Sequence, residues 1–140
     1  MESVEKTQIL IITPDEEQSG EIITILTDQK NCLLSFTGTR EALEIVKEKI
    51  FSPDIVIVEI AMVPLNGIGF AVQLKKILSD LARPTNLPII FVGNREKLSK
   101  LEKEITVNGG FALEREREIK PDQLLDTVQK AISGDLVAKE

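Results

Sequence analysis

The sequence of 140 residues contains no histidine, no tryptophan and no tyrosine, and it contains a single cysteine. Without histidine, the chain lacks the commonest general acid and base, the commonest metal ligand and every nucleophile that an imidazole activates. One cysteine excludes an internal disulfide bond and every zinc site that is built from several thiolates. Most familiar catalytic and metal-binding chemistries are therefore excluded.

Basic residues are also scarce relative to acidic ones, since 17 Lys and Arg stand against 23 Asp and Glu, a net charge of −6. This balance argues against a nucleic-acid partner. No apolar run approaches the roughly 18–20 residues that a membrane span needs, and the acidic N-terminus does not resemble a signal peptide. We therefore expect a cytoplasmic protein that contacts neither nucleic acid nor membrane.

Five short apolar runs alternate with amphipathic stretches along the chain. The runs comprise residues 9–12, 32–36, 55–58, 89–92 and 111–113. Because they are short, rich in β-branched side chains and apolar on both faces, they predict buried strands of a parallel sheet. The stretches with helical period comprise residues 16–29, 39–50, 67–82, 95–106 and 121–132. The pattern predicts an α/β fold of the (βα)5 type, a doubly wound five-stranded parallel sheet with helices on both faces.

Three of the predicted helices show a clear apolar face, and in the helix over residues 67–82 it contains Phe70, Leu74, Ile77, Leu78 and Leu81. In the helix over residues 39–50 we expect this face to contain Ala42, Leu43, Ile45, Val46 and Ile50. The last helix should begin at Pro121, because proline suits a first helical turn, and should bury Leu124, Leu125, Val128 and Ile132.

The candidate functional residues follow the predicted strands, where open α/β sheets concentrate their sites. They are Thr13, Pro14 and Asp15 after the first run, Glu59, Ile60 and Ala61 after the third, Gly93 and Asn94 after the fourth, and Glu114 after the fifth. No glycine-rich turn follows the first strand, so neither a Rossmann fingerprint nor a P-loop is present.

Three stretches of the sequence resemble the receiver domain of bacterial response regulators, the chemotaxis-regulator-like fold. Residues 53–67, PDIVIVEIAMVPLNG, resemble the stretch that carries the phosphoacceptor and its following loop. Residues 87–92, LPIIFV, are similar to the start of the fourth strand, and residues 121–125, PDQLL, to the start of the last helix. The resemblance covers residues 7–133 and implies the strand order 2-1-3-4-5. It also implies one receiver-like domain, with no output domain after it.

The resemblance implies a role for each position that holds Mg²⁺ or accepts the phosphoryl group. The acid pair of the family falls on Thr13 and Pro14, the phosphoacceptor aspartate on Glu59, and the metal-ligating backbone carbonyl on Ala61. Thr13 offers one neutral oxygen and Pro14 none, so we expect no cofactor and at most weak Mg²⁺ binding. The alternative is a weak cation site formed by Asp15, Glu59 and the carbonyl of Ala61.

Other positions of the family contact the phosphoryl group or respond to it. The hydroxyl residue falls on Gly93, the lysine that ends strand 5 on Glu114, and the switch aromatic on Phe111. We place Phe111 in a central strand, where phenylalanine is more often core than switch. Lys120 is the alternative candidate for the lysine position. An alignment that places Lys120 there would put charged residues into a buried strand, so we prefer Glu114. Every side chain of the phosphorylation site is then replaced.

Glu59 stands where the phosphoacceptor is expected but is one methylene longer than aspartate. A misplacement near 1 Å can slow a reaction by about 10²-fold. Without the lysine, the sequence predicts no fixed positive partner for this carboxylate. Its charge of −1 either mimics the phosphorylated state, which carries about −1.5 to −2, or belongs to a hydrogen-bonded carboxylate at an inactive site.

Lys97, Lys100 and Lys103 recur at three-residue spacing on the predicted fourth helix, in a region that serves receivers as an interaction surface. We weigh them as a partner surface against a solvated helix face. Cys32 lies in an apolar run and is expected to be an inert packed thiol.

These observations lead to one preferred function and two alternatives. The preferred one is a stand-alone receiver-like signalling module without enzymatic activity, which acts by phosphorylation-independent protein–protein contact. The resemblance implies a sensor kinase, a scaffold or another receiver as partner, with a homodimer left open. One alternative is a response regulator that is phosphorylated at an atypical site. The other is a small α/β domain that binds a cation or small ligand through Asp15, Glu59 and Glu114.

Overall fold

Strands and helices alternate along the chain in the order that the sequence predicts. The computed structural model describes residues 7–27, 31–62, 65–115 and 119–133. The strands are β1 (Thr7–Ile12), β2 (Asn31–Phe36), β3 (Ile55–Glu59), β4 (Ile89–Gly93) and β5 (Gly110–Glu114). The helices are α1 (Glu16–Thr27), α2 (Thr39–Lys47), α3 (Gly67–Asp80), α4 (Arg95–Lys100), α5 (Glu102–Val107) and α6 (Pro121–Ser133).

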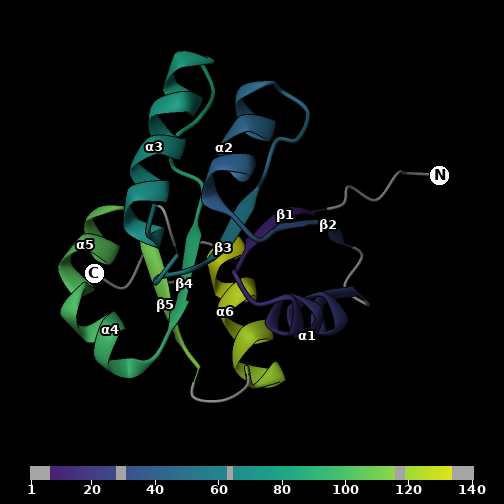
Figure 1. The fold of residues 1–140 in the computed structure, drawn as a ribbon, viewed down its shortest axis with the longest axis vertical. Helices are drawn as coiled ribbons and strands as arrows, with labels where there is room; N and C mark the ends of the chain where they lie inside the picture. The colour runs from purple at the N-terminus through teal and green to yellow at the C-terminus, as the bar shows by residue number, and fades with distance from the viewer. Residues whose placement is uncertain (1–6, 28–30, 63–64, 116–118, 134–140) are drawn as a thin grey trace.

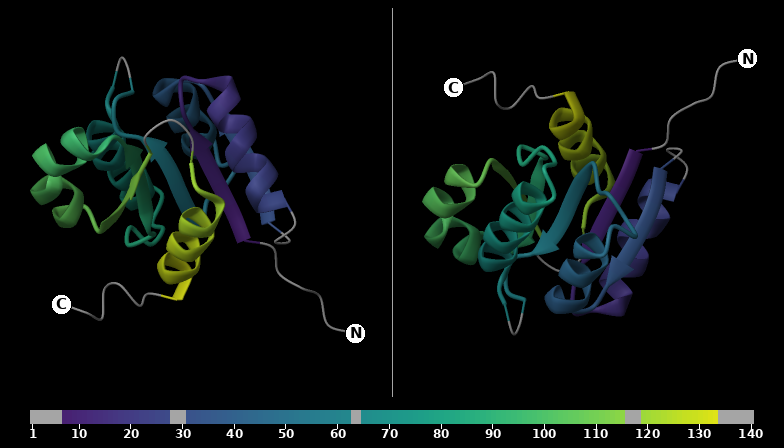
Figure 2. Two further views of the ribbon diagram at one scale, coloured as in Figure 1. Left: turned by 90° about the horizontal axis from the view of Figure 1, so that it is seen from below. Right: turned by 90° about the horizontal axis from the view of Figure 1, so that it is seen from above.

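The strands form one five-stranded parallel sheet in the order β2-β1-β3-β4-β5, so the predicted fold class is confirmed (Figure 1). Helices cover both faces of the sheet (Figure 2). Leu10 and Ile12 of β1 face the core cluster shared with α2 and α3, whereas Ile9 and Ile11 face the cluster shared with α1 and α6. A central strand that is buried on both faces must be apolar at every position, which explains the unbroken run in the sequence.

The fifth strand differs from its prediction. β5 lies at the edge of the sheet, so the central placement of Phe111 is wrong. Its burial alternates: Phe111 and Leu113 are buried, whereas Ala112 and Glu114 are exposed. An edge strand with one face in solvent needs apolar residues at every second position only.

The single helix predicted over residues 95–106 is also wrong, because the chain forms α4 and α5 with a break at Leu101 (φ −109°, ψ 19°). Leu98 and Ile105 still reach the same core cluster, so their spacing fits two short helices as well as one. Lys97 and Lys100 consequently lie on α4 and Lys103 on α5.

Two residues expected on buried helix faces are exposed. α2 ends at Lys47, and Lys49 adopts a left-handed conformation (φ 63°) that turns Ile50 into solvent, where it is 66% exposed. α6 begins at Pro121 as predicted, but Ile132 in its last turn is exposed, and Ala131 takes the buried position after Leu124 and Val128. Among the described residues, no helix is long and apolar enough to cross a membrane.

Candidate functional site at the carboxyl edge of the sheet

The carboxyl ends of the parallel strands meet at one edge of the sheet. Glu59 pairs in register with Val92, and Gly93 pairs with Glu114. Thr13 follows β1 directly and is held to β2, because its backbone N–H donates to the carbonyl of Phe36 (3.1 Å). The strand register therefore gathers the ends of β1, β3, β4 and β5 into one candidate site.

Glu59 is a buried carboxylate that already has a cationic partner. Its side chain is 6% exposed, and its Oε1 lies 2.8 Å from Nη2 of Arg115. Gln18, in the first turns of α1, donates its Nε2–H to the same oxygen at 3.5 Å. The expectation that Glu59 has no fixed positive partner is wrong, because Arg115 supplies the charge from the residue after β5.

The backbone positions Arg115 for this contact. Its N–H donates to the carbonyl of Gly93 (2.9 Å), which extends the β4–β5 pairing by one residue. The Arg115 side chain is 24% exposed, so the ion pair is largely shielded from water. Buried charges persist when they are paired with good geometry, and the loss of one partner then leaves the other charge poorly solvated. The sequence alone did not single out Arg115, because it is one of the alternating charges at 114–118. Residues 116–118 of this run lie outside the described residues.

Glu114, the residue at the lysine position, turns away from Glu59. Its Oε2 lies 3.1 Å from Nε of Arg95, and the two side chains are 45% and 80% exposed. Successive residues of a strand point to opposite faces, which is why the neighbours Glu114 and Arg115 reach different partners. Lys120 is exposed and lies immediately before α6, six residues beyond the end of β5.

The side chain of Ile60, the residue after Glu59, fills the space beside Gly93. Ile60 is buried, and a Cβ atom built on Gly93 would lie only 2.5 Å from Cγ2 of Ile60. Any side chain at position 93, including a hydroxyl-bearing one, would therefore collide with Ile60. Sequence reasoning missed this role of Ile60 because its apolar character only suggested a continuation of the strand.

Thr13, Pro14 and Asp15 form the turn between β1 and α1. Thr13 is buried, and its Oγ1 accepts a hydrogen bond from the N–H of Asp15 (3.1 Å). The Asp15 carboxylate accepts from the N–H of Glu17 (2.9 Å), so it caps α1. Pro14 is exposed, as is Ala61 after β3.

The three carboxylates considered for ligand binding have separate local partners. Asp15 bonds to the helix start, Glu59 to Arg115 and Glu114 to Arg95. In the described part of the chain, no three His, Cys, Asp or Glu residues are grouped so that they could hold a metal ion.

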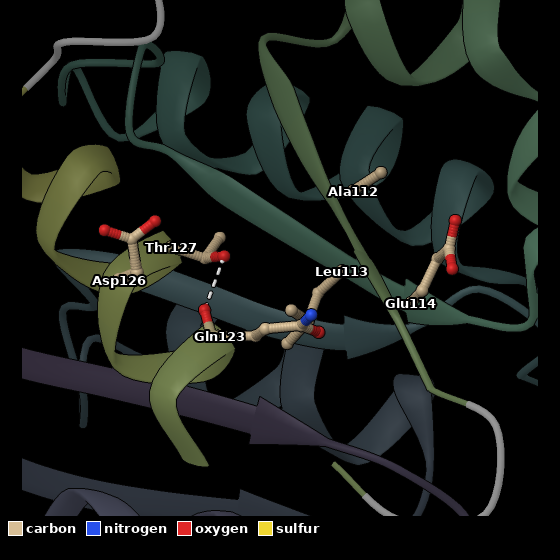
Figure 3. A pocket seen from close by; sticks show the side chains of 6 residues that line it. All are labelled: Ala112, Leu113, Glu114, Gln123, Asp126 and Thr127. Carbon is tan, nitrogen blue, oxygen red and sulfur yellow. Dashed lines mark hydrogen bonds between the residues drawn. The ribbon is translucent and has the colours of Figure 1, made fainter. Parts of the chain in front are cut away.

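A groove of about 320 Å³ lies between β5 and α6 (Figure 3). It is lined by Ala112, Leu113, Glu114, Gln123, Asp126 and Thr127. Its two acids are paired with basic residues elsewhere, Glu114 with Arg95 and Asp126 with Lys130 (3.3 Å). The lining includes neither Glu59 nor Arg115, so this groove is not the space around the buried ion pair.

The remaining sequence-predicted residues lie apart from the ion pair. Lys97, Lys100 and Lys103 are exposed, and Lys100 lies 3.8 Å from Glu96 on the same helix. Phe111 is buried in the core cluster that includes residues of α1 and α6. Cys32 is a free thiol that packs, half-buried, against the opposite cluster.

No family profile and no curated protein matches the sequence, but the fold is similar to solved receiver structures. A response regulator receiver domain protein from Clostridium thermocellum superposes with a TM-score of 0.76 at 20% identity, covering 94% of this chain and 98% of that one. The chemotaxis response regulator CheY4 of Vibrio cholerae gives 0.72 at 19% identity, covering 91% and 99%. A two-component response regulator from Clostridium difficile gives 0.69 at 21% identity, covering 94% and 98%. The chain therefore has the fold of response regulator receiver domains over nearly its whole length.

Proposed function

We propose that this protein is a receiver-like signalling module that acts through protein–protein contact and does not depend on phosphorylation. The observation that carries the proposal is the buried ion pair between Glu59 and Arg115 at 2.8 Å. By the resemblance to receivers, Glu59 falls on the phosphoacceptor position and Arg115 directly follows the lysine position at Glu114, so the pair supports a site that contains its own cation.

Three features of the site oppose phosphoryl transfer to Glu59. One oxygen of the Glu59 carboxylate, Oε1, is held by Arg115 and Gln18, which fixes the orientation of the group. A phosphoryl donor needs metal or other cations at its oxygens, whereas Thr13 offers a single hydroxyl that already bonds to Asp15. Ile60 occupies the space beside Gly93. These features favour a closed site that has a structural role.

Partners of such a module are signalling proteins: a sensor kinase, a scaffold or another receiver, including a second copy of this chain. The exposed lysines of α4 and α5 remain candidates for part of the contact surface. We expect no enzymatic activity, no cofactor, no contact with nucleic acid, and a cytoplasmic location. The net charge of −6 supports the expectation on nucleic acid.

The proposal is tested by exposure to a small phosphodonor, acetyl phosphate, with millimolar Mg²⁺, followed by intact-mass measurement. We expect no gain of a phosphoryl group. The matched variant is Glu59→Asp, which restores the shorter carboxylate but keeps Arg115 and Ile60, and it should also remain unmodified. A gain that is lost in Glu59→Gln would establish the atypical phosphoacceptor instead.

Two other interpretations of Glu59 have their own tests. Calcium and magnesium titrations followed by NMR should leave Asp15, Glu59 and Glu114 unshifted, whereas a saturable shift at all three would support a cation-binding domain. A mimic of the phosphorylated state requires that Glu59→Gln change affinity for a bound signalling partner more than it changes stability. We expect the effect on stability to dominate, because the carboxylate is already neutralised by Arg115.

A further inference from the structure

A second groove lies on the opposite edge of the sheet, between α1 and the end of β2, and has a volume of about 430 Å³. It is lined by Glu16, Ser19, Gly20, Ile23, Ser35, Phe36 and Thr37. We propose that this groove binds an extended, basic segment of a partner protein. The inference rests on the proposed role as a protein-binding module, and it places the contact away from the buried ion pair.

Small residues on both walls create the groove. Leu33 of β2 packs against the core cluster shared with α1 and α6, and Ser35 lies two residues further along the same face of the strand. Leu33 fills the space between β2 and the cluster, but the smaller side chain of Ser35 leaves the equivalent space at position 35 open. On the helix side, a Cβ atom added to Gly20 would meet no other atom within 4 Å. The groove is therefore open because positions 20 and 35 lack bulky side chains.

The groove adjoins β2, which is an edge strand of the sheet among the described residues. β2 is the first strand in the sheet order, and the carbonyl of Phe36 points toward β1, where it accepts from Thr13. Backbone groups alternate in direction along a strand, so those of Ser35 point away from β1. Unpaired backbone groups at a sheet edge can hydrogen-bond an added strand, and the neighbouring groove can then hold its side chains. This arrangement suits an extended segment.

The charge around the groove selects a basic occupant. Glu16 lines the groove, its sequence neighbours Asp15 and Glu17 are exposed, and α1 contains no Lys or Arg. None of the ion pairs within residues 7–27, 31–62, 65–115 and 119–133 uses these carboxylates. Ile23 adds apolar surface on which the stems of long side chains can lie. A lysine or arginine side chain combines an aliphatic stem with a positive head, which matches both features.

The test uses two synthetic nonapeptides, one alternating arginine with valine and one alternating glutamate with valine, titrated into the ¹⁵N-labelled protein. We expect the basic peptide to shift the amide signals of Ser19, Gly20, Ser35 and Thr37 saturably, and the acidic peptide to shift none of them. The affinity should fall as salt is raised, since the attraction is partly electrostatic. Absence of saturable shifts at these amides, or equal shifts with both peptides, would overturn the proposal.

Filling the groove gives the decisive comparison. Gly20→Leu, and separately Ser35→Leu, should weaken binding of the basic peptide about tenfold or more, because the side chains would occupy the site. Thr24→Leu adds similar bulk at an exposed position of α1 that does not line the groove, and it should leave the affinity unchanged. Equal affinities for all these variants would place the contact elsewhere and refute the proposal.

Two further outcomes separate this inference from the proposed function. Shifts at the same amides that depend on protein concentration alone would identify a second copy as the occupant, and would overturn the basic-segment proposal. The phosphodonor experiment does not involve the groove. If the peptides fail while the protein stays unmodified by acetyl phosphate, the docking site is wrong and the phosphorylation-independent role stands.

Discussion

Removal of Arg115 should expose the energetic role of the buried ion pair. Arg115→Met retains the apolar stem, but the 6% exposed carboxylate of Glu59 then keeps, among the described residues, only the hydrogen bond from Gln18 at 3.5 Å. Breaking a fully buried pair costs about 3–5 kcal/mol. Because Arg115 is 24% exposed, we expect a smaller loss of about 2–3 kcal/mol in the free energy of unfolding. For a domain of this length, that corresponds to a fall in Tm of about 7–10 °C.

Removal of the negative charge from the same ion pair should lower the free energy of unfolding less. In Glu59→Gln the carboxamide is nearly the same size and can still accept from Gln18, while the partly exposed guanidinium can turn toward water. We therefore expect a loss of about 1 kcal/mol. The two single variants thus predict an asymmetry, in which the loss of the cation costs more than the loss of the anion.

Urea unfolding monitored by circular dichroism at pH 7 measures these differences. The control is Arg95→Met, which breaks the ion pair between Arg95 and Glu114. The two side chains of this pair are 80% and 45% exposed, so its loss should lower the free energy of unfolding by no more than about 1 kcal/mol. A change below about 0.5 kcal/mol for Arg115→Met, or a larger loss for Glu59→Gln than for Arg115→Met, would show that Arg115 does not stabilise the buried carboxylate in this way.

Three further predictions concern neighbouring parts of the structure. Gly93→Thr should destabilise the protein by about 1–3 kcal/mol, because the new Cβ atom would lie 2.5 Å from Cγ2 of Ile60. Adding Ile60→Ala to the same chain should remove part of that strain, which urea unfolding of the single and double variants can measure. Asn66→Ala should lower the free energy of unfolding by about 1 kcal/mol, because the Asn66 side chain caps α3 by accepting a hydrogen bond from the N–H of Gly69 (2.8 Å). An unchanged urea midpoint would show that this cap does not stabilise the helix. Burial lowers the pKa of Lys75 below its usual value of 10.5, so the folded state binds this proton less tightly than the unfolded state does. Stability should accordingly rise as pH increases from that lowered pKa toward 10.5, and a pH series of urea titrations should show no such rise for Lys75→Met.

The buried strands could be predicted from the sequence because each central strand must be apolar on both faces. The runs at residues 9–12, 55–58 and 89–92 fall within β1, β3 and β4 for this reason. Local signals also placed the start of α6 at Pro121. The break at Leu101 could not be predicted, since Leu98 and Ile105 reach the core in either arrangement.

The candidate site was harder to predict, because its chemistry depends on contacts between distant residues. The strand ends at Glu59, Gly93 and Glu114 follow from the alternation of elements. The pairing of Glu59 with Arg115 joins residues 56 positions apart and depends on which way the chain turns after β5. A run of alternating charges does not reveal which of its members turns inward.

We propose that the Glu59–Arg115 pair closes the site against a phosphoryl group. An NMR titration of the ¹⁵N-labelled protein with Mg²⁺ and beryllofluoride, which mimics a phosphoryl group on a carboxylate, tests this closure. If the site is closed, the amide signals of Thr13, Glu59, Gly93 and Arg115 stay unshifted at saturating concentrations. Saturable shifts concentrated at these four residues would show that the ion pair opens to admit the group and that the site is not closed.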